Sequence, residues 1–361
     1  MKYGLVYYKY TDNMGDDILS YAAKRFLPHV DYYIDRERMD AFTPNETEHV
    51  AVILNGWFLH HTYAFPPSPY LIPLFIGTHF GKDYTTFANY SWLDGYVAEY
   101  LHRYEPIGCR DKNTLQAMQE RQIESFFSGC LTMTLEPFPG IEKTDRIVLT
   151  DVSADAEAYI RNFCPHNEII CKTHTIEEPD KNKEWSLREQ QLEENLKLYQ
   201  SAKLVITTRL HCALPSIALG TPVILIGNFN DDFHDRIADY TKYFKCFDIK
   251  AFLSGEADPL ILNSFENGDI SALRKALIHS CKDFITRTES MGTSRNDLPT
   301  PEQYQELYVK RTSFVHRSMD QLIHNHAQLL YQYKQEHEKY VELSELSQKL
   351  MTEYQRLLNT R

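Results

Sequence analysis

The sequence lacks most of the features that mark secreted, metal-binding or membrane-spanning proteins. Its seven cysteines are odd in number and irregularly spaced, no CxxC pair occurs, and no His/Cys cluster has the spacing of a zinc site. No apolar run reaches the roughly 20 residues of a membrane span, and the chain starts with a strand-like segment instead of a basic signal peptide. We therefore expect a soluble, cytoplasmic protein with free thiols, no metal, no cofactor and at most peripheral association with membranes.

Positive charge is also scarce. The 361 residues carry 38 Lys+Arg against 50 Asp+Glu, a net charge of −12. The segment from Ser313 to Arg361 is balanced, so the negative excess lies in residues 1–312. An acidic body argues against nucleic acid as the main partner. It also means that an anionic substrate needs a local basic pocket.

Strand-like runs alternate with helical segments along most of the chain, which is typical of parallel sheets covered by helices on both faces. The runs are at residues 4–8, 50–54, 71–76 and 106–109, and then at 146–150, 168–172, 204–207, 223–226 and 246–248. Leu135 to Lys143, with two prolines and a glycine, separates the two series. This organisation predicts an α/β fold with two Rossmann-like domains, residues 1–138 and 139–290, facing each other across a cleft.

The C-terminal part of the chain has a different character. Residues 291–312 include a polar stretch with two prolines and are expected to be a linker. From Met319 a 3-4 spacing selects apolar or aromatic residues at nine of twelve positions, a heptad pattern sustained over about five repeats. We expect residues 313–361 to form a long helix that makes the protein a homo-oligomer. The alternative is a single helix packed back on the body.

The most informative segment is residues 204–226, LVITTRLHCALPSIALGTPVILI. It predicts a buried strand, an N-cap at Thr207 or Thr208, and a helix with Arg209 and His211 in its first turn. A helix N-terminus at a strand end favours anions and disfavours cations. The presence of an arginine and a histidine at this position therefore indicates an additional anion site, with His211 as a proton carrier beside it. The alternative is that Arg209 caps a neighbouring helix and His211 is a buried core residue.

The same segment resembles the signature of the polysaccharide pyruvyl transferases. Three further motifs match in order, Asn13-Met14-Gly15-Asp16-Asp17, Pro106-Ile107-Gly108-Cys109-Arg110-Asp111 and Ser128-Gly129-Cys130-Leu131-Thr132. The resemblance covers roughly residues 1 to 290. Two positions depart from it, Cys212 where many members have glycine, and the sequence from Leu54 to Trp57 where many have a glycine-rich turn. The resemblance implies a glycosyltransferase-B-like arrangement of the two domains.

The resemblance also implies an activity, the transfer of the pyruvyl group of phosphoenolpyruvate to sugar hydroxyls to form a cyclic ketal in bacterial capsule or exopolysaccharide biosynthesis. The partners expected are phosphoenolpyruvate and a sugar or lipid-linked oligosaccharide acceptor. The donor carries a phosphate and a carboxylate, and arginine binds both through bidentate hydrogen bonds. The chemistry needs an acid for the methylene carbon, a base for a hydroxyl, and cations for the donor.

His211 is the best proton carrier, because an unperturbed histidine titrates near neutral pH. Arg209 and Thr208 are expected to bind phosphoenolpyruvate. Arg110 follows a short strand in the first domain and is expected to reach the donor across the cleft. The alternative for Arg110 is an ion pair with Asp111 or a helix cap.

The acceptor side is assigned by position and resemblance. One of Asp16 and Asp17 is expected to cap the first helix, and the other to face the cleft as a catalytic carboxylate, with Asp16 favoured by the resemblance. Asn13, together with Asn55 and Trp57 after the second strand, is expected to bind the acceptor, although Trp57 also fits a core position. Three further histidines are interpreted as structural or surface residues: His60, His61 and His79.

Two other functions fit the architecture. A nucleotide-sugar glycosyltransferase often carries a Glu-x7-Glu pair before a conserved turn, but counting back from Gly220 those positions are Pro215 and Thr207. The second alternative is a non-catalytic assembly subunit of a polysaccharide-synthesis complex, organised by the C-terminal helix. The presence of both Arg209 and His211 argues against this alternative.

Overall fold

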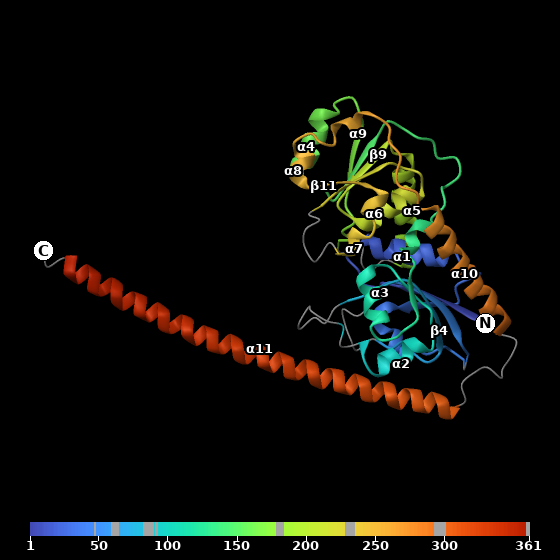
Figure 1. Ribbon diagram of the computed structural model, residues 1–361, viewed down its shortest axis with the longest axis horizontal. Helices are drawn as coiled ribbons and strands as arrows, with labels where there is room; N and C mark the ends of the chain where they lie inside the picture. Colours follow the sequence, from blue (N-terminus) through green and yellow to red (C-terminus); the bar gives the residue numbers. More distant parts are fainter. Residues whose placement is uncertain are drawn as a thin grey trace. The chain divides into compact units, whose positions relative to one another are not determined.

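The computed structural model describes residues 1–46, 48–58, 65–81, 90, 93–177, 184–227, 235–291 and 301–358. They form two parallel sheets with accompanying helices, and a long C-terminal helix (Figure 1). The chain divides into two compact units, Met1–Gln305 and Glu306–Arg361. Both sheets lie in the first unit. The expected α/β fold with a long C-terminal helix is therefore present.

The first sheet has six parallel strands in the order β2-β1-β3-β4-β5-β6. Its strands are β1 (Lys2–Tyr7), β2 (Tyr32–Asp35), β3 (Val50–Phe58), β4 (Leu71–Phe80), β5 (Ile107–Cys109) and β6 (Ser125–Phe127). The helices of this part are α1 (Met14–Lys24), α2 (Tyr96–His102) and α3 (Lys112–Gln119), with 3₁₀ helices η1 (Arg36–Ala41) and η4 (Leu131–Thr134).

Strand β3 is longer than the sequence predicted. Its pairing with β4 shifts register between Leu54 and Gly56 and then continues to Phe58. Gly56 makes this possible, because it has a φ of 111° and a β-carbon there would collide with the hydroxyl of Tyr8. The expectation that Asn55 and Trp57 follow the strand is therefore wrong, and both lie inside it.

The second sheet has five parallel strands in the order β11-β10-β9-β7-β8. Its strands are β7 (Ile147–Thr150), β8 (Ile169–Lys172), β9 (Leu204–Thr207), β10 (Val223–Ile226) and β11 (Lys245–Phe247). Its helices are α4 (Ala154–Phe163), α5 (Trp185–Ser201), α6 (Leu210–Ala218), α7 (Asp235–Ala238), α8 (Ile249–Leu253) and α9 (Asp258–Leu262), with the 3₁₀ helix η7 (Thr241–Tyr243).

The N-cap of helix α6 differs from the predicted one. The helix starts at Leu210 and its N-cap is Arg209, with a φ of −102° and a ψ of 124°, and not Thr207 or Thr208. Thr207 Oγ1 accepts a hydrogen bond from the Arg209 backbone N–H at 3.0 Å and fixes the turn from strand to helix. The side chain of Arg209 is therefore not required for capping and is available to face outward.

One continuous apolar cluster connects the two sheets. It includes Leu5 and Ile53 of the first sheet, Val148 and Val205 of the second, and buried residues of α1, α5 and α6. Helix α10 (Ser271–Met291) follows the second sheet in the chain, yet it contacts β4 and η4 of the first part. The two sheets are thus held as parts of one packed body, which fixes the side chains at their facing strand ends.

The long helix α11 (Pro301–Leu358) starts at the end of the first unit and makes up the described part of the second, and Figure 1 draws it as one continuous helix. It begins at Pro301, so residues 301–312 are helical and the linker is shorter than the sequence predicted. Many of its apolar side chains are exposed, among them Leu322, Leu329, Tyr333, Tyr340, Leu343 and Leu350. In the described part of the chain, no helix combines the length and hydrophobicity that crossing a membrane requires.

Candidate active site

The loop between β1 and α1 joins the two halves of the body. Met14 N–H donates to the carbonyl of His174 at 2.7 Å, and Ile176 N–H donates to the carbonyl of Asp12 at 2.7 Å. An isolated antiparallel bridge pairs Asn13 with Thr175. The NxGDD motif is therefore fixed against the loop that follows β8, and its side chains lie where the carboxyl ends of both sheets meet.

Arg110 and His211 come from different sheets and meet at this junction. Nη1 of Arg110 lies 3.4 Å from Nε2 of His211. A guanidinium only donates, so Nε2 must accept, and the proton of the neutral ring is then on Nδ1. Gly15 lies against the same ring, because a β-carbon there would be 2.9 Å from Nδ1. This close approach explains the glycine of the NxGDD motif.

Arg110 is a buried cation with unused hydrogen-bonding capacity. Only 4% of its surface is exposed, and its Nε has no hydrogen-bond partner within the described residues. Its backbone N–H donates to the Thr78 carbonyl at 2.7 Å, and its carbonyl accepts from the Tyr240 hydroxyl at 2.6 Å. The backbone is thus fixed from both halves of the body, and the guanidinium is placed to bind an anion.

Arg209 is placed differently. Its Nε donates to Oδ2 of Asp151 at 2.9 Å, and 46% of its side chain is exposed. Burial would raise the pKa of Asp151, but hydrogen bonds from Thr173 and His174, with the charge of Arg209, bring it below its usual value. Thr208 Oγ1 donates to the Asp151 carbonyl at 2.9 Å. Arg209 and Thr208 are thus both held by hydrogen bonds to Asp151, at the end of the second sheet.

The two aspartates of the NxGDD motif have separate environments. The helix cap is neither of them, because Asn13 Oδ1 accepts the Gly15 N–H at 3.0 Å, and this corrects the expectation that Asp16 or Asp17 caps α1. Asp17 is buried and forms an ion pair with Arg188 of α5, and burial raises its pKa to about 7 despite that cation. Asp16 is partly exposed and accepts from Thr11 Oγ1 at 2.6 Å.

Asp16 lines a pocket of about 440 Å³ at the ends of β1 and β3. The pocket mixes aromatic, acidic and basic side chains, and its lining residues are Tyr8, Lys9, Tyr10, Thr11, Asp12, Asn13, Asp16, Arg36, Glu37 and Trp57. Arg36 lies over the Tyr8 ring at 4.2 Å and donates to the Trp57 carbonyl at 2.7 Å. Such a mixture suits a polar ligand with an apolar face, such as a sugar.

Asn55 takes part in this pocket only indirectly. The side-chain amide of Asn55 is buried and donates to the Leu19 carbonyl at 3.0 Å. The backbone carbonyl of Asn55 accepts from the Tyr8 hydroxyl at 3.0 Å. Asn55 therefore holds Tyr8, which forms part of the pocket wall. Trp57 lines the pocket itself, and Asn13 lines it beside the N-terminus of α1.

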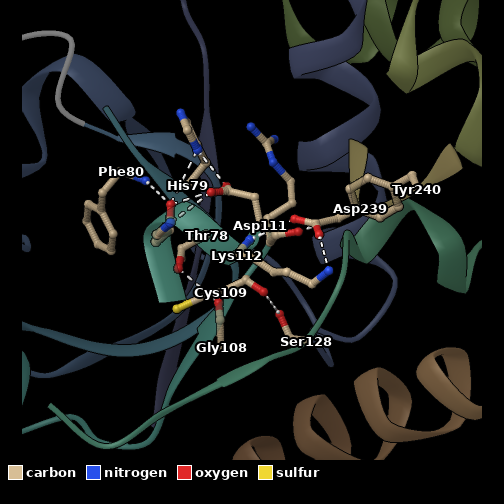
Figure 2. A network of polar contacts seen from close by, with 12 residues as sticks. Thr78, His79, Phe80, Gly108, Cys109, Asp111, Lys112, Ser128, Asp239 and Tyr240 are labelled. Carbon is tan, nitrogen blue, oxygen red and sulfur yellow. Dashed lines mark hydrogen bonds and ion pairs between the residues drawn. The ribbon is translucent and has the colours of Figure 1, made fainter. Parts of the chain in front are cut away.

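A buried histidine–aspartate pair lies next to Arg110, and the sequence interpretation missed it. Nδ1 of His79, in β4, is 2.6 Å from Oδ2 of Asp111, the residue after Arg110 (Figure 2). Asp111 also accepts the Thr114 N–H at 2.9 Å as the N-cap of α3. The carboxylate thus holds His79 and α3, and does not form the ion pair with Arg110 that was the alternative. Burial would raise the pKa of Asp111, but His79 and these hydrogen bonds lower it.

The remaining motif and histidines have other positions. Ser128 Oγ accepts the Gly77 N–H at 3.0 Å and donates to the Cys109 carbonyl at 3.1 Å, so the SGCLT motif ties the strand end that carries Arg110 to its neighbours (Figure 2). Cys212 is fully buried in α6. His60 and His61 lie outside the described residues.

Comparisons with known proteins identify the family of this chain. A family model described as polysaccharide pyruvyl transferase matches residues 13–231, which include the NxGDD motif, Arg110 and His211. No curated protein matches the chain. A solved structure of an uncharacterised protein from Klebsiella pneumoniae is 13% identical, with a TM-score of 0.38 over 69% of this chain and 92% of its own. The family match spans more than half of the sequence, and the chain therefore belongs to the polysaccharide pyruvyl transferase family.

Proposed function

We propose that this protein transfers the pyruvyl group of phosphoenolpyruvate to two hydroxyls of a sugar acceptor, as a cytoplasmic step in the synthesis of a bacterial capsule or exopolysaccharide. The observation that carries the proposal is the approach of the buried Arg110 guanidinium to Nε2 of His211 at 3.4 Å. A buried cation beside a proton carrier suits a small anion that must be protonated during the reaction.

The reaction is balanced without oxidation or reduction. The bond from C2 of phosphoenolpyruvate to the phosphate oxygen breaks, and two bonds from C2 to sugar oxygens form. The two hydroxyls lose one proton each, the methylene carbon gains one, and the departing phosphate gains the other. The enzyme therefore has to bind a multiply charged donor and move two protons.

The donor side of the proposed site uses residues of both sheets. Arg110 binds the phosphate or the carboxylate, and its burial strengthens that interaction. Binding of the donor anion beside Arg110 favours the protonated form of His211, which delivers a proton to the methylene carbon. Arg209 and Thr208 complete the donor site from the end of β9, where the terminal nitrogens of Arg209 make no hydrogen bond within the described part of the chain. Arg209 can therefore bind the donor through its terminal nitrogens while its Nε stays hydrogen-bonded to Asp151.

The acceptor side of the proposed site is the 440 Å³ pocket. Asp16 lines it and serves as the base for one hydroxyl, while Asp17 is committed to Arg188. Trp57 and Asn13 contact the sugar, and Asn55 supports the pocket wall through Tyr8. In this proposal the two sheets act as the two Rossmann-like halves of a glycosyltransferase-B-like enzyme, with donor and acceptor between their strand ends.

The test is incubation with phosphoenolpyruvate and a panel of free and lipid-linked oligosaccharide acceptors. We expect phosphate release that depends on the acceptor, and a new methyl signal of a pyruvate ketal in the product NMR spectrum. A parallel panel of nucleotide sugars should give no turnover. Hydrolysis or transfer of a nucleotide sugar, with no consumption of phosphoenolpyruvate under any condition, would overturn the proposal.

A further inference from the structure

A further inference concerns the second proton of the reaction, and it rests on the proposed function. His211 supplies the methylene carbon and Asp16 serves one hydroxyl. The second hydroxyl must still lose a proton, and the departing phosphate must gain one. A single group that both accepts and donates near neutral pH can serve both, and an imidazole has this property.

We propose that His79, oriented by Asp111, is this second proton carrier. In the proposed step, the protonated imidazole gives its Nε2 proton to the phosphate oxygen as the bond from that oxygen to C2 breaks. The neutral Nε2 then accepts the proton of the second acceptor hydroxyl as the hydroxyl oxygen bonds to C2, which restores the protonated ring. No net change in charge is left on the enzyme after the cycle.

The first support is the way in which Asp111 holds the ring. Its Oδ2 lies 2.6 Å from Nδ1 of His79 and accepts from Thr114 Oγ1 at 3.2 Å, while Oδ1 accepts the Thr114 N–H at 2.9 Å (Figure 2). The carboxylate is therefore fixed by α3 before it meets the histidine. A carboxylate on one ring nitrogen fixes the orientation of the ring and stabilises its protonated form.

The second support is position. His79 lies near the end of β4, and Arg110 directly follows β5, the parallel neighbour of β4, where the Arg110 N–H donates to the Thr78 carbonyl. On its other side the His79 ring meets the ring of Trp57 edge-on, with centroids 5.6 Å apart. His79 is thus bracketed by the proposed donor cation and by a wall of the proposed acceptor pocket. It retains 7% of its surface exposed.

The test compares two rates in heavy water with phosphoenolpyruvate and acceptor. One rate is deuterium exchange into the methylene group of recovered phosphoenolpyruvate, which reports reversible addition of the first hydroxyl with carbon protonation. The other rate is phosphate release. His79→Gln should lower phosphate release by about 10²- to 10⁴-fold and leave methylene exchange within a few-fold of wild type. His211→Gln should abolish both rates.

Two further variants make the result specific. Asp111→Asn keeps an oxygen for the Thr114 N–H, because asparagine is a good N-cap, but it no longer stabilises a charged imidazole. It should therefore reproduce the separation of the two rates with the fold intact. His49→Gln is the matched control, since His49 is also 7% exposed and lies just before β3, away from the pocket lining. It should leave both rates unchanged.

The outcomes separate the two proposals. If the wild-type protein does not consume phosphoenolpyruvate, the proposed function fails. If the wild-type protein is active and His79→Gln releases phosphate at the wild-type rate, the role of His79 fails. Equal loss of exchange and release in both His79→Gln and Asp111→Asn, with unchanged thermal unfolding, would also overturn it, because the pair would then act only on site structure.

Discussion

The two sheets each present an arginine at a strand end, and the two arginines differ in their surroundings. Arg110, after the first sheet's β5, is 4% exposed and its Nε has no hydrogen-bond partner among the residues described, whereas the side chain of Arg209 is 46% exposed and already paired with Asp151. Electrostatic attraction is much stronger in a buried, low-dielectric site than at a surface. The first sheet therefore supplies a fixed cation, and the second sheet an adjustable one.

The same contrast extends to the neighbouring side chains. Beside Arg110 the pair of His79 and Asp111 is buried and bonded to α3. Beside Arg209 the carboxylate of Asp151 is shared among several donors near the surface. We infer that the first sheet determines the geometry of the donor site, while the second contributes charge and the proton carrier His211.

The largest effect on catalysis is expected for His211, which lies after β9 of the second sheet and contacts Arg110, the residue after β5 of the first. His211→Gln should reduce kcat by about 10²- to 10⁴-fold, because the proton carrier for the methylene carbon is lost. The KM for phosphoenolpyruvate should change little, since the donor charges are bound by arginine. Steady-state phosphate release measures both constants. A variant with wild-type kcat would remove His211 from the mechanism.

The next largest effect is expected for Arg110, the buried arginine of the first sheet. Arg110→Gln should raise the KM for phosphoenolpyruvate by about 10- to 100-fold, the equivalent of a hydrogen bond to a charged group of 1.5–3 kcal/mol. Its unfolding temperature without ligand should not fall much, because the guanidinium makes no ion pair within the described residues. The increase in unfolding temperature on adding phosphoenolpyruvate should disappear. Retention of that increase would show that the anion binds elsewhere.

A third prediction concerns the junction between the sheets. His174 is buried with Nε2 2.8 Å from the Tyr199 hydroxyl, and burial lowers its pKa from 6.5 to about 4. Between these pH values the unfolded chain binds a proton that the folded protein does not, so stability falls as pH decreases through this window. The loss amounts to about 3 kcal/mol.

This pH effect is measured by urea unfolding between pH 7 and pH 4. His174→Gln should flatten the dependence of the free energy of unfolding on pH in that window, because no imidazole remains to be protonated. His166→Gln, at an exposed position, is the control and should keep the wild-type slope. An unchanged slope in the His174 variant would assign the acid sensitivity to other groups.

A smaller effect on the KM for phosphoenolpyruvate is expected for Arg209, the exposed arginine of the second sheet. Arg209→Gln should raise the KM for phosphoenolpyruvate by less than about tenfold, because exposed ion pairs contribute only about 0–1 kcal/mol. The kcat should stay near the wild-type value. An effect equal to that of Arg110→Gln would show that the surface around Arg209 becomes buried when substrate binds, and would remove the contrast between the sheets.

The sequence predicted the parts of this arrangement that depend on local pattern. The bounds of β9 and β10 agree with the predicted ranges, because each is an apolar run bordered by polar or glycine residues. Strands β2 and β6 were missed because neither is an apolar run: β2 is Tyr-Tyr-Ile-Asp and β6 is Ser-Phe-Phe. The N-caps of α1 and α6 were misassigned by one to four residues, as several polar residues precede each helix and only the backbone decides among them.

Side-chain contacts that depend on strand register or on packing between distant elements could not be predicted from the sequence. Asp17 and Asp16 are adjacent and chemically alike, yet only the packing of Arg188 from α5 separates the structural from the exposed carboxylate. The pairing of His79 with Asp111 depends on the single register contact between Thr78 and Cys109. One signal was available, because His79 lies near the end of β4, Arg110 and Asp111 directly follow β5, and the ends of parallel neighbours meet at one edge of a sheet.

The smallest effect on catalysis is expected from removal of α11. The proposed site residues all lie before Met291, and Met1–Gln305 is a compact unit, so a chain ending at Met291 should keep kcat within about twofold of wild type. Its oligomeric state should fall. The exposed apolar residues of α11 would leave a long apolar strip in contact with water, which soluble proteins rarely tolerate, and a second copy of the same heptad stripe is the complementary partner.

Light scattering on the full-length and truncated proteins measures this effect. The seam is interrupted at His326, Glu336 and Ser347, so we expect an association of moderate strength that dissociates on dilution. Replacement of Leu329 and Leu343 by Lys should lower the oligomeric state as truncation does, while the same change at the exposed polar positions Gln328 and Glu342 serves as control. If the full-length protein is monomeric at all concentrations, the stripe is covered by another surface and not by a second copy.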